Sequence, residues 1–268
     1  MLEVKGLTVA YESGDAVRDV SFTANQGEWI MLIGPNGAGK STLLAAVAQC
    51  AAYRGSVLLE SRDARRWKPR AFAQAVGVLA QTHAAGYAFT VEELVTMGRY
   101  AHTRGFFRSQ DPDGQEAVRR ALDMTGLWNL RGRNVQTLSG GELQRAFLAQ
   151  AMAQEPRVLL LDEPANHLDL VYQKQLFELI GRWMAEGGRC VISVVHDLSL
   201  ALRYGTRALL LDRGCVTADG PAAAVLASDA LRRAYGMDVA TWMADMAGRW
   251  REVAAAGSQN GSQDAKAG

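Results

Sequence analysis

The sequence is poor in cysteine, has no excess of charge of either sign and lacks long apolar runs. Its three cysteines, Cys50, Cys190 and Cys215, form no C-x-x-C pair, which suits a reducing compartment better than a disulfide framework or a metal finger. The 29 basic residues balance 28 acidic ones, so no global basic field favours nucleic acid as a partner. No window approaches about 18 apolar residues, and the N-terminus has no apolar signal region, so we expect a chain that is neither secreted nor membrane-spanning by itself.

Strand-like apolar segments alternate with helical patterns along most of the chain. Continuous apolar runs, typical of strands covered on both faces of a parallel sheet, lie at residues 28–34, 75–81, 157–164, 190–197 and 207–214, after shorter strand patterns at 7–11 and 20–24. Helical patterns lie at residues 40–49, 91–99, 114–126, 142–154, 170–186 and 197–205. The alternation predicts an α/β, doubly wound core, and the stretch without strands, about 86–153, predicts an inserted helical subdomain.

The end of the sequence has a different composition. The segment GSQNGSQDAKAG, residues 257–268, is rich in glycine, serine and glutamine and has no apolar face. Because such a composition buries too little apolar surface to offset the entropy of an ordered chain, we expect a disordered tail there.

The segment GPNGAGKST, residues 34–42, matches the pattern G-x-x-x-x-G-K-[ST] between a predicted strand and a predicted helix. Glycines let successive backbone N–H groups point at one phosphate, and the helix N-terminus adds its positive dipole end. A lysine then reaches the β and γ phosphates, and a serine hydroxyl is offered to Mg²⁺. A plain glycine-rich turn is the weaker alternative. The motif predicts a nucleoside triphosphate site made by Gly34, Pro35, Asn36, Gly37, Ala38, Gly39, Lys40, Ser41 and Thr42.

A second segment, VLLLDE, delivers two acidic residues to the end of a buried strand. Ligands of α/β proteins bind at the carboxyl ends of the strands. We expect Asp162 to belong to the Mg²⁺ shell and Glu163 to be the general base that orients or deprotonates a water molecule. The alternative is that these acids form a helix N-cap before Pro164. The phosphate-binding motif makes the catalytic interpretation the stronger one.

Polar residues end two further strand patterns. Gln81 is a candidate to reach Mg²⁺ or the lytic water, and His196 to hydrogen-bond the γ phosphate. Each also has an ordinary interpretation, because a glutamine at a strand end often belongs to a loop and a single histidine is often structural. Their shared position at strand ends favours a role in the site.

The segment LSGGELQR begins another predicted helix with two adjacent glycines. Ser139 and Glu142 have the spacing of a capping box, which explains both residues. Capping does not explain Gly140 and Gly141, whose combined helix penalty is about 2 kcal/mol. Close approach of an anion to the bare backbone N–H groups would explain them.

The order of GPNGAGKST, Gln81, LSGGELQR, VLLLDEP, HLD and VVHD resembles the nucleotide-binding subunits of ABC transporters over about residues 2–240. The resemblance implies a P-loop NTPase (RecA-like) core sheet with an antiparallel β subdomain and an inserted α-helical subdomain. It implies an ATP-binding domain over residues 1–240 and a C-terminal extension over 241–268. It also implies ATP and Mg²⁺ as cofactors.

The resemblance implies a head-to-tail dimer of two copies that encloses two ATP molecules. Ser139, Gly140 and Gly141 of one copy would then face the γ phosphate held by Lys40 of the other. It further implies that Asp169 crosses this interface. Tyr11 would stack on adenine, although a tyrosine at the end of a strand pattern is also a packing residue.

The family docks coupling helices of two membrane permease subunits in a groove beside the helical subdomain. The resemblance therefore implies a peripheral protein on the cytoplasmic face of the inner membrane, an indirect link to an extracytoplasmic substrate-binding protein, and no nucleic acid partner. We expect Tyr87, Phe89 and Val91 to line the groove. This sequence departs from the family at Glu142, where Gln is common, and at Asn166 and His167, where smaller residues are common.

Within the family, the segments FTVEELVTMGRY, ANHLDLVYQKQLFELI and GPAAAVLASDALRRAYGMDV look most like importers of iron–siderophore complexes, haem and cobalamin. The alternatives are an ATPase for another solute or for an exporter, and a soluble ABC-type ATPase of DNA repair or translation. The last is disfavoured because the span from Lys40 to Ser139 has no room for a long coiled coil and the chain has a single phosphate-binding motif.

Overall fold

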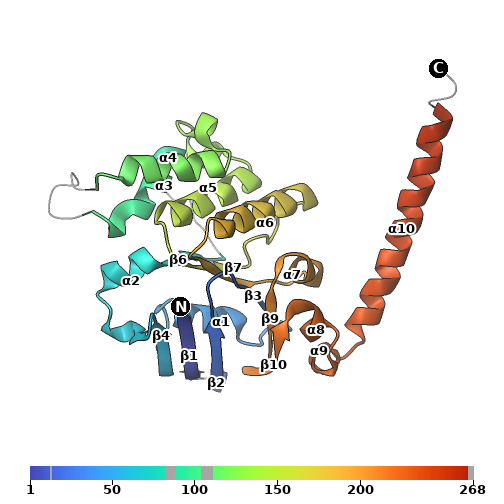
Figure 1. Cartoon of the computed structure of the whole chain (residues 1–268), viewed down its shortest axis with the longest axis horizontal. Coiled ribbons are helices and arrows are strands. Elements are labelled where there is room, and N and C mark those ends of the chain that lie inside the picture. Colours follow the sequence, from blue (N-terminus) through green and yellow to red (C-terminus); the bar gives the residue numbers. More distant parts are fainter. Residues whose placement is uncertain (13, 82–87, 104–110, 265–268) are drawn as a thin grey trace.

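Two sheets form the body of the protein (Figure 1). The computed structural model describes residues 1–12, 14–81, 88–103 and 111–264. The strands are β1 (Leu2–Tyr11), β2 (Gly14–Ala24), β3 (Trp29–Ile33), β4 (Arg54–Leu59), β5 (Arg62–Asp63), β6 (Val76–Leu79), β7 (Val158–Asp162), β8 (Cys190–Val194), β9 (Arg207–Asp212) and β10 (Cys215–Pro221). The helices are α1 (Lys40–Val47), α2 (Pro69–Ala75), α3 (Val91–Met97), α4 (Gly114–Met124), α5 (Gly140–Ala153), α6 (Leu170–Ala185), α7 (Leu198–Tyr204), α8 (Ala222–Leu226), α9 (Asp229–Tyr235) and α10 (Val239–Asp264).

The larger sheet has the strand order β10-β9-β3-β8-β7-β6. Its strands from β9 to β6 are parallel, and β10 is an antiparallel edge strand. Every residue of β3 and β8 is buried, as expected for a sheet covered on both faces. The segments that follow β3, β6, β7 and β8 therefore leave the sheet at its carboxyl-terminal edge, and β8 separates β3 from the acidic strand β7.

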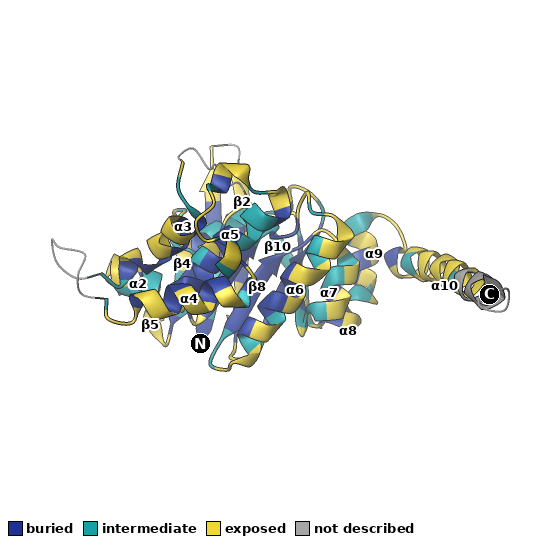
Figure 2. Cartoon of the chain, turned by 90° about the horizontal axis from the view of Figure 1, so that it is seen from above, coloured by how far each residue is buried: buried dark blue, intermediate teal, exposed yellow. Residues whose placement is uncertain are grey.

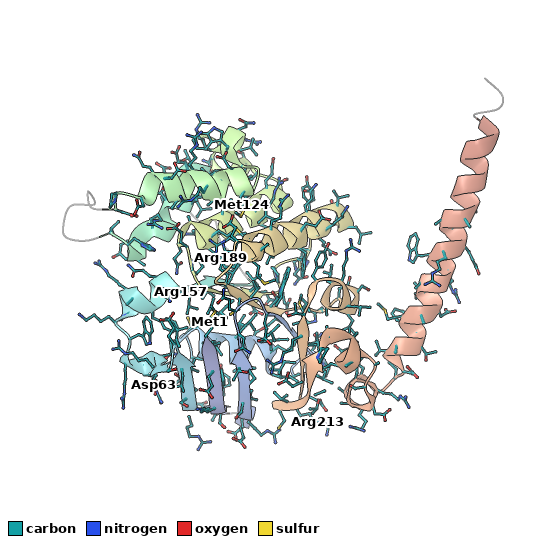
Figure 3. The ribbon with its side chains drawn as sticks, in the orientation of Figure 1. Met1, Asp63, Met124, Arg157, Arg189 and Arg213 are labelled. Atoms are coloured by element: carbon teal, nitrogen blue, oxygen red, sulfur yellow. The ribbon has the colours of Figure 1, made fainter. Side chains whose placement is uncertain are left out.

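The smaller sheet is antiparallel, with the order β2-β1-β4-β5, and confirms the β subdomain that the family resemblance implies. Its strands β4 and β5 lie outside the expected strand patterns, because they are short and carry few buried positions. An ion pair between Glu60 and Arg157 links the turn after β4 to the start of β7. Arg157 is labelled in Figure 3.

Two apolar cores cover the two faces of the larger sheet. One contains α1 between the sheets, with Ile30, Leu32 and Leu43 among its members. The other packs the opposite face against α5, α6, α7 and α8. In it, the rings of Trp29 and Phe177 stack at 5.4 Å, and Trp29 Nε1 donates a 2.9 Å hydrogen bond to Ser193. The alternation of neighbouring strand residues between the cores fixes the register of the parallel strands.

The helices α3, α4 and α5 pack against one another to one side of the larger sheet (Figure 1). Arg99, two residues after α3, is buried and forms ion pairs of 2.8 Å with both Asp111 and Glu155. It also donates to the carbonyl of Ala153. These bonds satisfy a buried guanidinium that would otherwise be costly, and they tie α3 to the end of α5.

Helix α10 extends away from the body (Figure 1). Val239 and the half-buried Met243 pack against the core, whereas the α10 stripe, defined as Trp242, Met246, Trp250 and Val253, is exposed (Figure 2). The helix includes residues 257–264, where the composition predicted a disordered tail. These residues can be helical because adding a residue to an existing helix does not require the costly nucleation of a new one. No helix of the described residues is long and apolar enough to cross a membrane.

Candidate nucleotide-binding site

The loop between β3 and α1 requires glycine at two positions. Gly34 has φ +142°, and a Cβ there would overlap the carbonyl oxygen of Leu211. Gly39 has φ +98°, and a Cβ there would overlap the carbonyl oxygen of Ala16. Side chains are therefore excluded by backbone conformation and by contact with other backbone atoms. The loop reaches the N-terminus of α1 in the form that a phosphate cradle needs.

Lys40 is the first residue of α1 and is buried. Its ammonium donates hydrogen bonds to the carbonyls of Gly34 at 2.8 Å and Pro35 at 2.9 Å. Burial lowers the pKa of Lys40, and the charges of Glu163 and Asp162 oppose that shift. The Lys40 ammonium thus lies inside the loop, on the side that faces Asp162 and Glu163.

Ser41 and Asp162 join the phosphate loop to β7. The Ser41 hydroxyl donates a 2.9 Å hydrogen bond to Asp162 Oδ1. Burial raises the pKa of Asp162, because the ionised carboxylate loses water, and the hydrogen bond from Ser41 acts in the opposite direction. A hydroxyl and a carboxylate are oxygen ligands of the kind that Mg²⁺ prefers, so these residues fit a divalent cation beside the phosphates.

Glu163 is the hydrogen-bonding centre of the site. Its Oε1 lies 2.6 Å from His196 Nε2. Its Oε2 accepts a 2.8 Å hydrogen bond from Gln81 Nε2 and a 3.0 Å hydrogen bond from Asn166 Nδ2. Glu163 has φ +51°, a strained conformation for a residue with a side chain. The structure thus brings together the polar residues expected after β6, β7 and β8.

Asn166 was not predicted as part of this cluster. In the sequence it was only a departure from the smaller residues common in the family. The turn after β7 explains its contact, since the Asn166 N–H donates to the carbonyl of Glu163 at 3.1 Å and so folds the asparagine back over the carboxylate. Asparagine is common in turns, but no pattern in the sequence pointed to its contact with Glu163.

The helix start at LSGGELQR has the predicted capping box. Ser139 accepts from the N–H of Glu142, and the Glu142 carboxylate accepts from the N–H of Ser139. The two glycines differ. A Cβ on Gly141 would lie 2.7 Å from the ring of Tyr172, so packing within the chain already requires glycine there. A Cβ on Gly140 would meet nothing within 4 Å, so the chain itself gives no reason for that glycine.

Other predicted residues lie further from the cluster. Tyr11 is 54% exposed at the end of β1. Asp169 caps α6 by accepting from the N–H of Tyr172. The expectation that Val91 lines a docking groove is wrong, because Val91 is fully buried as the first residue of α3. Phe89 is half-buried against the same core, and Tyr87 lies outside the described residues.

Known proteins are similar to this chain in sequence and in fold. Residues 17–166 match the family model described as ABC transporter. The uncharacterized ABC transporter ATP-binding protein YvrA of Bacillus subtilis (strain 168) is 38% identical over 239 residues, which are 89% of this chain and 54% of that protein, so the chain spans about half its length. The hemin import ATP-binding protein HmuV of Nocardia farcinica (strain IFM 10152) is 42% identical over 240 residues, covering 87% of this chain and 82% of HmuV.

A solved structure of an ATP-binding subunit of an ABC transporter has a TM-score of 0.71 at 26% identity, over 89% of this chain and 95% of that one. The fold agrees with that structure over most of both chains. The chain therefore belongs to the ABC transporter family, as one of its ATP-binding subunits.

Proposed function

We propose that this chain is the ATPase subunit of an ABC importer for metal chelates, and that hydrolysis in a pair of its copies drives transport through separate membrane permease subunits. One observation carries the hydrolytic part: Ser41 of the phosphate loop donates to Asp162, and Glu163 follows directly in the chain. A phosphate cradle, a cation ligand and a general base thus share one site.

In this proposal the loop of residues 34–42 binds the triphosphate. Its backbone N–H groups and Lys40 hold the β and γ phosphates. Ser41, Asp162 and Gln81 would hold Mg²⁺, which when bound neutralises charge on the phosphate oxygens. Glycine at positions 34 and 39 allows the loop to adopt this conformation against the backbone of Leu211 and Ala16.

Glu163 acts as the base. A water molecule attacks the γ-phosphorus and passes a proton to the Glu163 carboxylate, the bond from that phosphorus to the bridging oxygen of ADP breaks, and ADP and inorganic phosphate are the products. The side chains of His196, Gln81 and Asn166 orient this carboxylate. His196 is half-exposed, so its ring is also available to a γ-phosphate oxygen.

The active form in this proposal is a head-to-tail dimer. The N-terminus of α5, with Ser139 and Gly140, faces the γ phosphate of the partner copy, Asp169 lies at the interface, and Tyr11 stacks on adenine. The open space at Gly140 and the exposure of Tyr11 support these roles. The dimer works on the cytoplasmic face of the inner membrane, on two permease subunits that receive cargo from a substrate-binding protein.

A metal chelate is the cargo that the relatives favour. HmuV of Nocardia farcinica is named as a hemin import protein and matches over most of both chains. The residues of the nucleotide site contact ATP and not cargo, so similarity over the whole chain supports this part of the proposal.

The hydrolytic role is tested by Glu163→Gln. We expect the variant to bind ATP, to lose steady-state hydrolysis and to accumulate as an ATP-bound dimer in size-exclusion chromatography. The matched control is Glu178→Gln, the same exchange at an exposed position of α6, which should keep wild-type turnover. Turnover of Glu163→Gln near that of the wild type would remove Glu163 from the role of base.

The cargo is tested by co-purifying the permease and reconstituting it with its binding protein in liposomes. We expect ATP-dependent uptake of ferric siderophore, haem or cobalamin, and no uptake with Glu163→Gln. Transport of an unrelated solute, or outward transport, would replace the cargo while leaving the ATPase assignment intact.

A further inference from the structure

The first two turns of α5 contact the segment from Glu163 to Tyr172 at three points. Gln144 Nε2 donates a 2.8 Å hydrogen bond to the carbonyl of Pro164, the residue after Glu163. The ring of Tyr172 lies against Gly141. The Arg145 guanidinium lies over the same ring, 5.8 Å from its centroid. The helix start with the two glycines is therefore bonded to the turn that carries the base.

Hydrogen bonds within the turn after Glu163 make it move as a unit, so a displacement at Pro164 reaches Glu163. The Asn166 N–H donates to the Glu163 carbonyl at 3.1 Å, and the Asn166 amide donates to the Glu163 carboxylate. Near the other end, Gln173 Nε2 donates to the carbonyl of Leu168 at 2.9 Å. A shift at Pro164 thus moves the backbone and the carboxylate of Glu163 together.

The hydrogen bond from Gln144 to Pro164 lies in a partly buried environment. Gln144 is half-buried, and its acceptor belongs to Pro164, which is buried and has no N–H group of its own. Loss of the amide would remove a donor from the carbonyl of a buried residue, and leaving such a group unpaired costs more than forming the bond gains. The bond therefore holds α5 and the turn in one arrangement.

We propose that Gln144 and Tyr172 are positioning residues that fix the orientation of Glu163 relative to the N-terminal end of α5. The inference rests on the proposed function, in which that end of the helix faces the ATP of the partner copy. Docking of the partner's nucleotide on Ser139 and Gly140 then sets the position of the base that serves the chain's own ATP. The two hydrolytic sites of the dimer are coupled through this contact.

The test is the pair Gln144→Glu and Gln144→Ala in the full-length chain. The first keeps the shape of the side chain and replaces its donor by a carboxylate, which repels the Pro164 carbonyl. We expect kcat for ATP to fall by about tenfold or more in both, because small misplacements of a catalytic group have effects of this size. The KM for ATP should stay within about twofold, since the phosphate loop is untouched.

Three comparisons complete the test. Gln150→Glu and Gln150→Ala are the matched controls, because Gln150 also lies on α5, is half-buried and has no side-chain hydrogen bond among the described residues. Gln144→Lys restores a donor within reach of the carbonyl and should recover most of kcat. In a Glu163→Gln background, Gln144→Glu should still form the ATP-bound dimer, because the interface residues are intact.

Some results would overturn the inference. Unchanged kcat in Gln144→Glu would show that the contact does not position the base. Loss of the ATP-bound dimer in the Glu163→Gln, Gln144→Glu double variant would assign Gln144 to the interface instead. If Gln144→Ala fails to fold, the same contact is tested by comparing Tyr172→Leu, which removes the ring, with Tyr172→Phe, which keeps it. Equal kcat values in these two variants would contradict the inference. Turnover near that of the wild type in the single variant Glu163→Gln would instead reject the role of Glu163 as base in the proposed function, which is a separate outcome.

Discussion

His196 Nε2 lies 2.6 Å from Glu163 Oε1, although the two residues follow different strands and are 33 positions apart in the chain. The contact arises because β7 and β8 are parallel neighbours and end at the same edge of the sheet. The carboxylate of Glu163 is thereby oriented from one side by an imidazole and from the other by the amides of Gln81 and Asn166.

Removing this imidazole should affect turnover more than binding. We expect His196→Ala to lower kcat about 10²-fold or more, with nucleotide affinity close to that of the wild type, because a positioned acid–base partner contributes on this scale. Steady-state ATPase kinetics and binding of a fluorescent nucleotide measure both. His102→Ala is the control, since His102 bonds the Gln154 carbonyl away from the cluster; equal losses in both variants would contradict a specific role of His196.

The two glycines at the start of α5 should respond differently to alanine. Gly140→Ala should leave the free energy of unfolding unchanged or raise it by up to about 1 kcal/mol, because the methyl group meets open space and alanine favours a helix. It should nevertheless lower turnover, since in the proposed dimer the methyl group faces the partner's phosphate. Chemical denaturation and ATPase assays measure the two effects, and wild-type turnover would leave Gly140 without a role at the interface.

Gly141→Ala should instead destabilise the isolated chain, by roughly 1–3 kcal/mol, because its methyl group would overlap the Tyr172 ring. The double variant Gly141→Ala, Tyr172→Ala removes the obstruction. We expect it to be no less stable than Tyr172→Ala alone. Additive destabilisation in the double variant would show that the ring is not the reason for this glycine.

Asp162 should limit stability at neutral pH. Burial raises the pKa of Asp162, so the ionised carboxylate is disfavoured in the folded chain. The protonated carboxyl group therefore contributes to the free energy of unfolding below the ordinary pKa of aspartate. This contribution is lost as the pH rises through the pKa of Asp162 in the folded state. Asp162→Asn stays neutral and still accepts from Ser41. Without nucleotide, it should unfold at a higher temperature than the wild type at pH 7, by about 2–4 °C for each kcal/mol recovered.

The same comparison at a lower pH gives the control. Near pH 3, where aspartate is mostly protonated in both states, the advantage of Asp162→Asn should disappear. The variant should also lose ATP hydrolysis that depends on Mg²⁺. A lower unfolding temperature than the wild type at pH 7 would contradict the electrostatic argument.

The outer part of α10 should be dispensable for the ATPase body. A chain ending at Met243 keeps Val239 and Met243, which contact the core, and should match the full-length chain in kcat and unfolding temperature. A chain ending at Asp238 loses both contacts and should be less stable by roughly 1–3 kcal/mol. Equal stability of the two truncated chains would mean that these contacts contribute little.

Local motifs predicted much of the site because their chemistry depends on backbone form. Gly34 and Gly39 are required by positive φ and close backbone contacts, and the capping box of Ser139 and Glu142 is complete within four residues. The strand order was not predictable in the same way. That β8 lies between β3 and β7 depends on how whole strands pack, and this arrangement decides that Asp162 meets Ser41.

Other details depended on tertiary contacts between distant segments. No local pattern indicated that Tyr172 covers Gly141, so an anion was the natural explanation for both glycines. Val91 was placed in the groove where the family docks its coupling helices, yet its apolar side chain is buried in the core. Asn166 reaches Glu163 through a turn that the flanking residues alone did not specify.

The exposed face of α10 gives the protein an intrinsic optical reporter. Of its six tryptophans, Trp242 and Trp250 are exposed, at 52% and 66%, whereas the others are buried or half-buried. A water-soluble quencher such as iodide should therefore reduce mainly the fluorescence of these two rings. Any molecule that covers the α10 stripe would shift their emission to shorter wavelength and protect them from quenching, without a label on the chain.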